Sequence, residues 1–209
     1  MVAWTGLLFM LCGTLTSAVS CDWLTQYKSV SNDTQVLLKL MGDQLTAQDT
    51  SAPALCFPSN LYENIRKSEV ESKLVFIRDS LKLISCLYRH DNLSSAPWDA
   101  DRTERFLTVI HRQITEVNAC VSERLLSPAD SSLKRYYGRL ANSTVSCAGC
   151  STASWDLLRM ETKLRLDQLE LLVASIIRGS AAPSRRRSAA QQQHNSNSDT
   201  ASEDSGDCF

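Results

Sequence analysis

The sequence predicts an all-α protein: a bundle of five main helices in up-up-down-down order, with long crossover connections. Apolar residues recur at alternating steps of three and four along several segments, which is the spacing of one face of an α-helix. No segment shows the period-two alternation and hairpin turns that indicate β-strands. Two connections are long or irregular, as is typical of up-up-down-down bundles. With 209 residues, the chain is expected to form one folded domain.

Residues 1–20 have the features of a secretory signal peptide. An apolar run from Leu7 to Leu15 is followed by small residues at positions 18–20 that suit cleavage, although a charged n-region is missing. The fully apolar part is too short to span a membrane. We therefore expect a secreted, extracellular protein whose mature chain begins at Cys21.

The first two helices are expected at residues 23–45 and at about residues 70–88. The second has the more regular pattern, with apolar side chains at alternating steps of four and three: Val70, Leu74, Ile77, Leu81, Ile84 and Tyr88. Between the two helices, residues 47–62 contain two prolines and several serines. This composition predicts a long loop, and long ordered loops are often functional.

The third and fourth helices have recognisable starts. The third is expected at about residues 102–121, where Asp101 followed by Glu104 fits a capping box. The fourth is expected to start near Pro128 and Asp130, because proline and a carboxylate are favoured in the first helical turn. Their buried faces are predicted at Phe106, Ile110, Gln113, Val117, Leu133, Tyr136, Tyr137 and Leu140.

Residues 155–177 are expected to form the central helix, around which the others pack. Ser154 is the predicted N-cap, and Gly179 the predicted stop. One apolar face follows steps of three and four, and a second apolar line has heptad spacing, so this helix needs several neighbours. The first face consists of Leu158, Thr162, Leu166, Leu169, Val173 and Ile176, and the second line of Leu157, Leu164 and Leu171. The polar side is expected to consist of Arg159, Lys163, Arg165 and Asp167.

The helical domain is expected to cover residues 21–178, and a disordered tail is expected at residues 179–209. The tail is rich in Ser, Ala, Gln and Asn and has too few apolar residues to offset the entropy of ordering. It holds three of the 22 basic and four of the 23 acidic residues, which leaves 19 of each in the domain. A folded part without net charge does not indicate binding to nucleic acid or insertion into a membrane.

No set of residues in the sequence indicates an enzyme, a metal site or a cofactor. The histidines His90, His111 and His194 each lack a second group at the spacing that metal binding or catalysis requires. Cys147 and Cys150 form a CxxC pair, but neither the second pair of a zinc site nor the context of a redox enzyme accompanies it. Disulfide bonding with a structural role is the better interpretation of these two cysteines. GxSxG, HExxH and phosphate-binding glycine loops are missing.

The mature chain would contain seven cysteines, because the eighth lies in the signal peptide. Seven is an odd number, so at least one thiol must stay free or pair between molecules. Three Asn-x-Ser/Thr sequons, at Asn32, Asn92 and Asn142, agree with a secreted protein and should be exposed if they carry glycans.

Several short motifs occur in an order and spacing that are fairly specific when taken together. They are Phe57-Pro58 after the first long connection, Ser95-Ala96-Pro97-Trp98-Asp99, Val117-Asn118-Ala119-Cys120-Val121 at the end of the third helix, and Ala153-Ser154-Trp155-Asp156 at the start of the last. With Cys21 as its mature N-terminus, the chain resembles type I interferons over residues 21–178. The runs at 74–80, 90–95 and 161–164 are most similar to the teleost branch.

This resemblance implies a secreted antiviral cytokine that bridges two different class II cytokine receptor chains, a heterodimer similar to the interferon alpha/beta receptor. Signalling would pass through JAK kinases and STAT factors to antiviral genes. One receptor chain is expected to contact the first helix, the long connection and the last helix, and the other chain the opposite face. Matched positions on the last helix place Arg159, Met160, Lys163 and Leu164 in the first interface. Leu164 could equally belong to the core. No cofactor is implied, and a monomer is expected.

The resemblance also implies two disulfide bonds. The first joins Cys21 to Cys120 and closes a ring of roughly 100 residues, which contributes about 4–5 kcal/mol in the chain-entropy model. The second joins the first long connection to the entrance of the last helix, with Cys56 and Cys150 as the favoured pair and Cys147 as the alternative partner. Cys86 and Cys208 have no assigned partner.

Two other classes of protein stay open on the sequence. An interleukin-10 or type III interferon relative would share the fold and the class of receptor. A secreted helical enzyme or lipid carrier would instead require a convergent catalytic triad or an open apolar cavity.

Overall fold

A computed structural model of the chain describes residues 21–43, 56–121, 129–146 and 151–192, and within these residues every regular element is helical. The elements are α2 (Asp22–Leu40), α3 (Ser59–Lys67), α4 (Val70–Leu87), the 3-10 helix η1 (Asp91–Ser95), α5 (Ala100–Cys120), α6 (Ser131–Thr144) and α7 (Thr152–Gln192). The expected all-α class is confirmed. None of the described helices is both long and apolar enough to cross a membrane.

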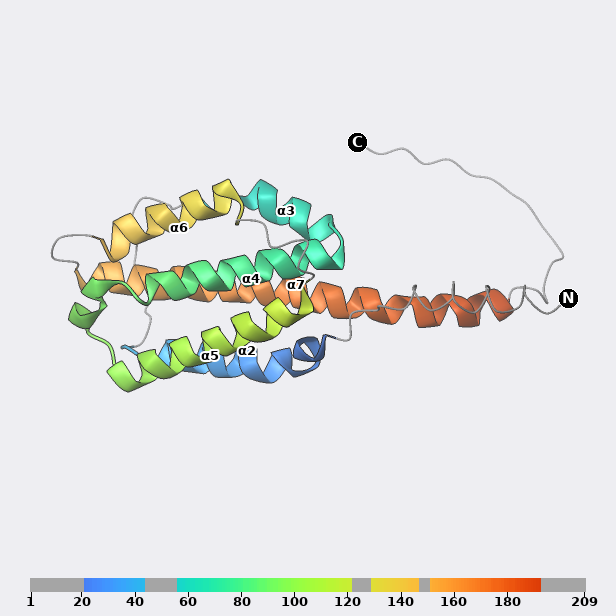
Figure 1. Cartoon of the computed structure of the whole chain (residues 1–209), viewed down its shortest axis with the longest axis horizontal. Helices are drawn as coiled ribbons and strands as arrows, with labels where there is room; N and C mark the ends of the chain where they lie inside the picture. Colours follow the sequence, from blue (N-terminus) through green and yellow to red (C-terminus); the bar gives the residue numbers. More distant parts are fainter. Residues whose placement is uncertain (1–20, 44–55, 122–128, 147–150, 193–209) are drawn as a thin grey trace, which may run out of the picture.

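Four long helices form the bundle, and α7, the longest, extends beyond it at one end (Figure 1). α2 and α4 run in one direction and α5 and α7 in the other, which is the up-up-down-down order. α2 packs on α5 and α7, and α4 packs on α5, α6 and α7. The shorter α6 is a fifth main helix that runs antiparallel to α7 beside α4.

The buried faces follow the predicted spacing closely. Leu74, Ile77, Leu81, Ile84 and Tyr88 of the second predicted helix are buried, whereas Val70, the first residue of that predicted face, is 39 % exposed. The expected face residues of α5 and α6 are all buried. All six positions of the first apolar face of α7 are buried as well. This agreement arises because a face that repeats every 3.6 residues can only be covered by packing it against neighbouring helices.

Two hydrogen bonds between buried side chains join neighbouring helices of the bundle. The Nε2 of Gln113 donates to Thr34 Oγ1 at 2.8 Å, joining α5 to α2. The hydroxyl of Tyr88 donates to Thr162 Oγ1 at 3.1 Å, joining the end of α4 to α7. Hydrogen bonds of this kind offset the cost of removing polar groups from water, so these positions can lie in the core.

The second apolar line of α7 was expected to pack against neighbours, and that expectation is wrong. Leu171 is 61 % exposed and Leu164 is 44 % exposed, whereas Leu157 is half-buried. The reason is that α2, α4 and α6 all lie against one side of α7 and leave this line uncovered. Leu164 is therefore a surface residue and not a core residue.

Two helical segments were not expected from the sequence. α3 (Ser59–Lys67) begins within the stretch predicted as a loop, residues 47–62, and continues beyond it, and η1 follows α4. Tyr62 explains why α3 forms, because its side chain is buried and its hydroxyl donates to the carbonyl of Gln168 on α7. A nine-residue helix is too short to be stable without such tertiary contacts.

Three helix starts differ from the predicted caps by two or three residues. Asp99, not Asp101, caps α5 by accepting from the backbone N–H of Arg102 at 2.8 Å. Ser151, not Ser154, caps α7, because Ser151 Oγ accepts from the backbone N–H of Ser154. Asp130 caps α6 by accepting from the N–H groups of the second and third helical residues, so it precedes the first turn; Pro128 lies outside the described residues. In each case the helix begins after the residue whose side-chain oxygen accepts a hydrogen bond from a backbone N–H of the first turn.

The expected helix stop at Gly179 is also not observed, because α7 continues to Gln192. Gly179 does not have the left-handed backbone that a glycine stop uses. The following stretch contains alanine, arginine and glutamine, all of which favour helix. The segment past Gly179 projects away from the bundle (Figure 1). Disorder of residues 193–209 and removal of residues 1–20 stay predictions, since both segments lie outside the described residues.

The Cys21–Cys120 disulfide is present and ties the start of α2 to the end of α5. The bonded residues are 99 positions apart in the sequence, so the bond closes a very large ring. Cys86 is exposed on α4. The expected partners of Cys56, which are Cys150 or Cys147, lie outside the described residues, as does Cys208.

Replacing Cys21 and Cys120 together by serine should lower the free energy of unfolding by about 4–5 kcal/mol, because the open chain gains conformational entropy when it unfolds. Urea unfolding followed by circular dichroism would measure this loss. The matched control is Cys86→Ser, which removes an exposed thiol and should change stability by less than about 0.5 kcal/mol. Equal stability of the doubly substituted and wild-type proteins would contradict the entropic role of this bond.

Candidate functional site

The four residues expected at the first interface lie in the N-terminal half of α7, next to the C-terminal end of α2. Three of them reach the surface: Met160 and Lys163 are half-buried and Leu164 is exposed. The fourth, Arg159, has no exposed surface at all. The expectation that Arg159 faces outward is therefore wrong.

The guanidinium of Arg159 is buried because it binds the carbonyl groups at the end of α2. Its Nε donates to Leu38 O at 3.3 Å, and its Nη2 donates to Lys39 O at 2.9 Å. Its Nη1 donates to Asp43 O at 2.9 Å and lies 3.4 Å from the carboxylate of Asp156. The last carbonyls of a helix lack partners within the helix and carry partial negative charge, so a buried cation is stabilised there.

Other groups complete the same arrangement. Arg102 of α5 donates through Nη1 to Leu40 O, and the backbone N–H of Asp99 donates to Met41 O at 2.7 Å. Arg159 Nη2 also lies 3.5 Å from Gly42 O. Each carbonyl from residue 38 to residue 43 thus accepts a hydrogen bond from α7, from α5 or from the turn before α5. We call this set of contacts the α2 carbonyl clamp; it explains why α2 ends at Leu40 and not at residue 45.

The exposed side of α7 forms a second feature, which we call the outer face of α7. It consists of Met160, Lys163, Leu164, Asp167 and Leu171. Met160, Leu164, Asp167 and Leu171 follow each other at steps of four, three and four, so they share one side of the helix. Exposed leucines in a row on one helix are unusual for a surface without a partner and are typical of a protein-binding site.

Charged and polar groups fix one edge of the outer face of α7 against α2. Lys163 Nζ lies 2.7 Å from Asp167 Oδ2, four residues further along the helix. The other oxygen, Asp167 Oδ1, accepts from Gln35 Nε2 of α2 at 2.7 Å. The carboxylate therefore links the two helices, and the ammonium of Lys163 is held close to their junction.

The opposite edge of α7 is covered by an aromatic cluster. The guanidinium of Arg165 lies 4.0 Å from the ring centroid of Phe57, and Tyr136 of α6 packs edge-on against the same ring. The hydroxyl of Tyr136 donates to Glu161, and burial together with this contact raises the pKa of Tyr136. Arg165 was expected on the polar side, but it is buried. Cation–π contacts and Glu161, 3.7 Å from its Nη2, stabilise its charge there, while its Nε and Nη1 have no hydrogen-bond partner among the described residues.

A small polar cluster joins α4 to α5 on the other side of the bundle. Ser85 Oγ lies 2.8 Å from His111 Nε2, and Arg89 contacts both side chains through Nη2. Burial and the nearby charge of Arg89 both lower the pKa of His111. Near the start of α5, a cavity of about 280 Å³ is lined by Leu93, Trp98, Leu107 and neighbouring residues.

Among the described residues, no three metal-ligating side chains gather in one place. Of the sequon asparagines, Asn32 and Asn142 are exposed, as expected, and Asn92 lies in η1.

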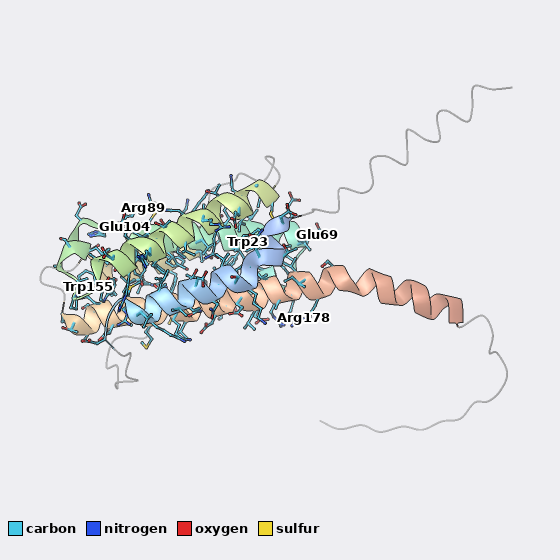
Figure 2. The ribbon with its side chains drawn as sticks, turned by 90° about the horizontal axis from the view of Figure 1, so that it is seen from below. Trp23, Glu69, Arg89, Glu104, Trp155 and Arg178 are labelled. Atoms are coloured by element: carbon cyan, nitrogen blue, oxygen red, sulfur yellow. A yellow bond between two sulfur atoms is a disulfide. The ribbon has the colours of Figure 1, made fainter. Side chains whose placement is uncertain are left out.

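Figure 2 shows how far apart the features of the bundle lie: Trp155 marks the beginning of α7, and Arg178 lies where α7 leaves the bundle. Arg89 and Glu104 lie together on the α4 and α5 side, away from the exposed side of α7. Of the four residues that the sequence predicted for the first receptor surface, Met160, Lys163 and Leu164 reach the surface; their contact with a receptor stays a prediction. The α2 carbonyl clamp was not predicted. The sequence feature that marks it is Gly42, which follows the end of α2 and lies against Arg159 of α7 in the structure.

Comparison with known proteins relates the chain to one family. The family model of the interferon alpha/beta domain matches residues 24–176. Interferon a3 of Oncorhynchus mykiss is 31 % identical over 177 residues, which cover 84 % of this chain and 98 % of the trout protein. The solved structure of zebrafish interferon 1 superposes with a TM-score of 0.64 at 26 % identity and covers 75 % of this chain and 99 % of that one.

The His111 cluster makes stability depend on pH in a defined direction. Because the folded protein lowers the pKa of His111 below its ordinary value of 6.5, the unfolded chain binds the proton more readily. Stability should therefore fall as the pH drops below about 6.5. His111→Gln, which cannot take up a proton, should lose less stability than wild type between about pH 7.5 and about pH 5.5 in urea unfolding. Identical pH dependence of the two proteins would contradict this assignment.

Proposed function

This chain belongs to the type I interferon family, in its teleost branch, and we propose that it is a secreted antiviral cytokine that bridges two different class II cytokine receptor chains. Signalling then runs through JAK kinases and STAT factors to antiviral genes. Interferons are signalling proteins and not enzymes, and the family match decides against an interleukin-10 or type III interferon relative.

The observation that supports a receptor-binding role is the exposed outer face of α7. Leu164 and Leu171 are large apolar side chains left uncovered on the longest helix, beside Met160 and the charged pair Lys163 and Asp167. An apolar centre with a polar rim is the usual composition of a protein interface. We propose that the first receptor chain binds this face together with the adjoining surface of α2. Within it, Met160, Lys163 and Leu164 are the proposed contacts.

The second receptor chain is proposed to bind the opposite side of the bundle, made by α4, α5 and α6. Two surfaces on opposite sides allow two receptor chains to be held at the same time by one monomeric molecule. The apolar cavity beside Leu93 and Leu107 and the polar group at Arg89 and His111 both lie on the α4 and α5 part of this side.

The function is tested with the protein secreted by cells that express the full chain. Purified protein should induce STAT phosphorylation in fish cells and protect them from a cytopathic virus. Secretion itself is checked by sequencing the N-terminus, which should be Cys21. The control is a cell line that responds to another fish interferon. If the folded protein gave neither STAT phosphorylation nor protection in those cells, the proposal would be contradicted.

Leu164→Asp should weaken binding to the first receptor chain by about tenfold or more, because a charge replaces an apolar contact in the centre of the interface. Surface plasmon resonance with the two receptor ectodomains measures each affinity separately. Leu164 is exposed, so folding should be unaffected. The matched control is Val70→Asp at the start of α4, which places the same change on an exposed valine outside the proposed face. Equal loss in both variants, or none in Leu164→Asp, would remove Leu164 from the interface.

A further inference from the structure

We infer that Arg159 is a positioning residue: through the α2 carbonyl clamp it holds the end of α2 against α7 and so fixes the shape of the first receptor-binding surface without touching the receptor. This inference rests on the proposed function, because it assigns a role within the same surface. It replaces the expectation that Arg159 is itself a receptor contact.

The burial of Arg159 excludes direct contact in this structure. Its side chain has no exposed surface, and its three nitrogens all donate to carbonyls of residues 38–43. A receptor side chain could reach the guanidinium only if the end of α2 moved away. That movement would leave a buried cation and several carbonyls without partners, which is costly.

Gly42 provides independent evidence that the end of α2 packs closely against Arg159. A Cβ atom at this position would lie 2.7 Å from Arg159 Nη1 and 2.9 Å from Trp98 Cδ1. Both distances are too short for any side chain, and Trp98 is itself held between Tyr88 and Trp155. The end of α2 can therefore approach the guanidinium only because residue 42 has no side chain.

The clamp has a direct effect on the exposed surface nearby. Two contacts register α2 against α7: the bond from Gln35 to Asp167, and the clamp that begins at Leu38 one turn further along α2. Lys39 is exposed while its carbonyl is held by Arg159, and Lys163 on α7 pairs with the same Asp167. Loosening the clamp lets the end of α2 shift while the outer face of α7 stays in place. A surface built from two helices would then lose its fixed shape, and binding would have to restore it at a cost in affinity.

The test compares four full-length secreted proteins: wild type, Arg159→Lys, Gly42→Ala and the double variant. Arg159→Lys keeps the charge but cannot donate to four carbonyls, whereas Gly42→Ala keeps the guanidinium and pushes the two elements apart. Binding to each receptor ectodomain is measured by surface plasmon resonance, and folding by thermal unfolding. Lys163→Ala serves as the control for a residue that lies on the surface.

Each single variant should bind the first receptor chain about tenfold more weakly, while binding to the second chain should change by less than about twofold. Because both changes break the same clamp, the double variant should be little weaker than either single one. Lys163→Ala combined with Gly42→Ala should instead give losses that multiply, since those two residues act separately.

Three results would overturn the inference. Wild-type affinity of Gly42→Ala together with a loss in Arg159→Lys would show that Arg159 acts by direct contact. Wild-type affinity of both variants would show that the clamp does not shape the surface. Parallel loss of both receptor chains would mean a general loss of folding; if Arg159→Lys does not fold, Gly42→Ala carries the test alone. If wild type itself binds neither receptor chain, it is the proposed function that fails.

Discussion

Burial of one continuous face of α7 is the constraint on which the rest of the bundle depends. That face runs from Leu158 to Ile176 and is covered by α2, α4 and α6 together. A single neighbour cannot cover so wide a stripe, because each helix contacts only a limited part of the surface of another. The chain therefore brings α2 and α4 alongside α7 through long connections and closes the group with α5. The Cys21–Cys120 bond joins the start of α2 to the end of α5 covalently.

Two cationic side chains of α7, Arg159 and Arg165, lie within this apolar framework beside specific partners. Arg159 is matched by the carbonyls at the end of α2, and Arg165 by the rings of Phe57 and Tyr136 and by Glu161. Both arginines are on α7, on opposite sides of its buried face. They join the helix to the segments that pack beside it, the end of α2 on one side and residues 56–58 with α6 on the other. Buried charge is expensive, so each of these sites specifies one arrangement of the elements that meet there.

The same packing divides the surface into two sides with different character. Because all neighbours of α7 lie on one side, its other side is left with Leu164 and Leu171 in water, which is a cost that folding alone does not explain. The α4 and α5 side carries polar groups such as Arg89 and His111 and one small apolar cavity. Under the function proposed above, two sides with unlike chemistry would give each receptor chain its own surface.

Sequence by itself determined the helical class, the buried faces of α4, α5, α6 and α7, the Cys21–Cys120 pairing through the family resemblance, and the segment of α7 that carries the candidate surface. These features are local or periodic, and a period of 3.6 residues is readable without knowing what lies opposite. Cap positions and the short helix α3 were not determined, because several residues could cap each helix and Tyr62 needs α7 to be in place.

Only the tertiary structure decided which side of α7 is covered. It placed the side chain of Leu164 at the surface and buried that of Arg159. An amphipathic pattern predicts a place on the polar face for an arginine. The sequence shows its charge but not the carbonyls, 120 residues away in the chain, that accept its hydrogen bonds.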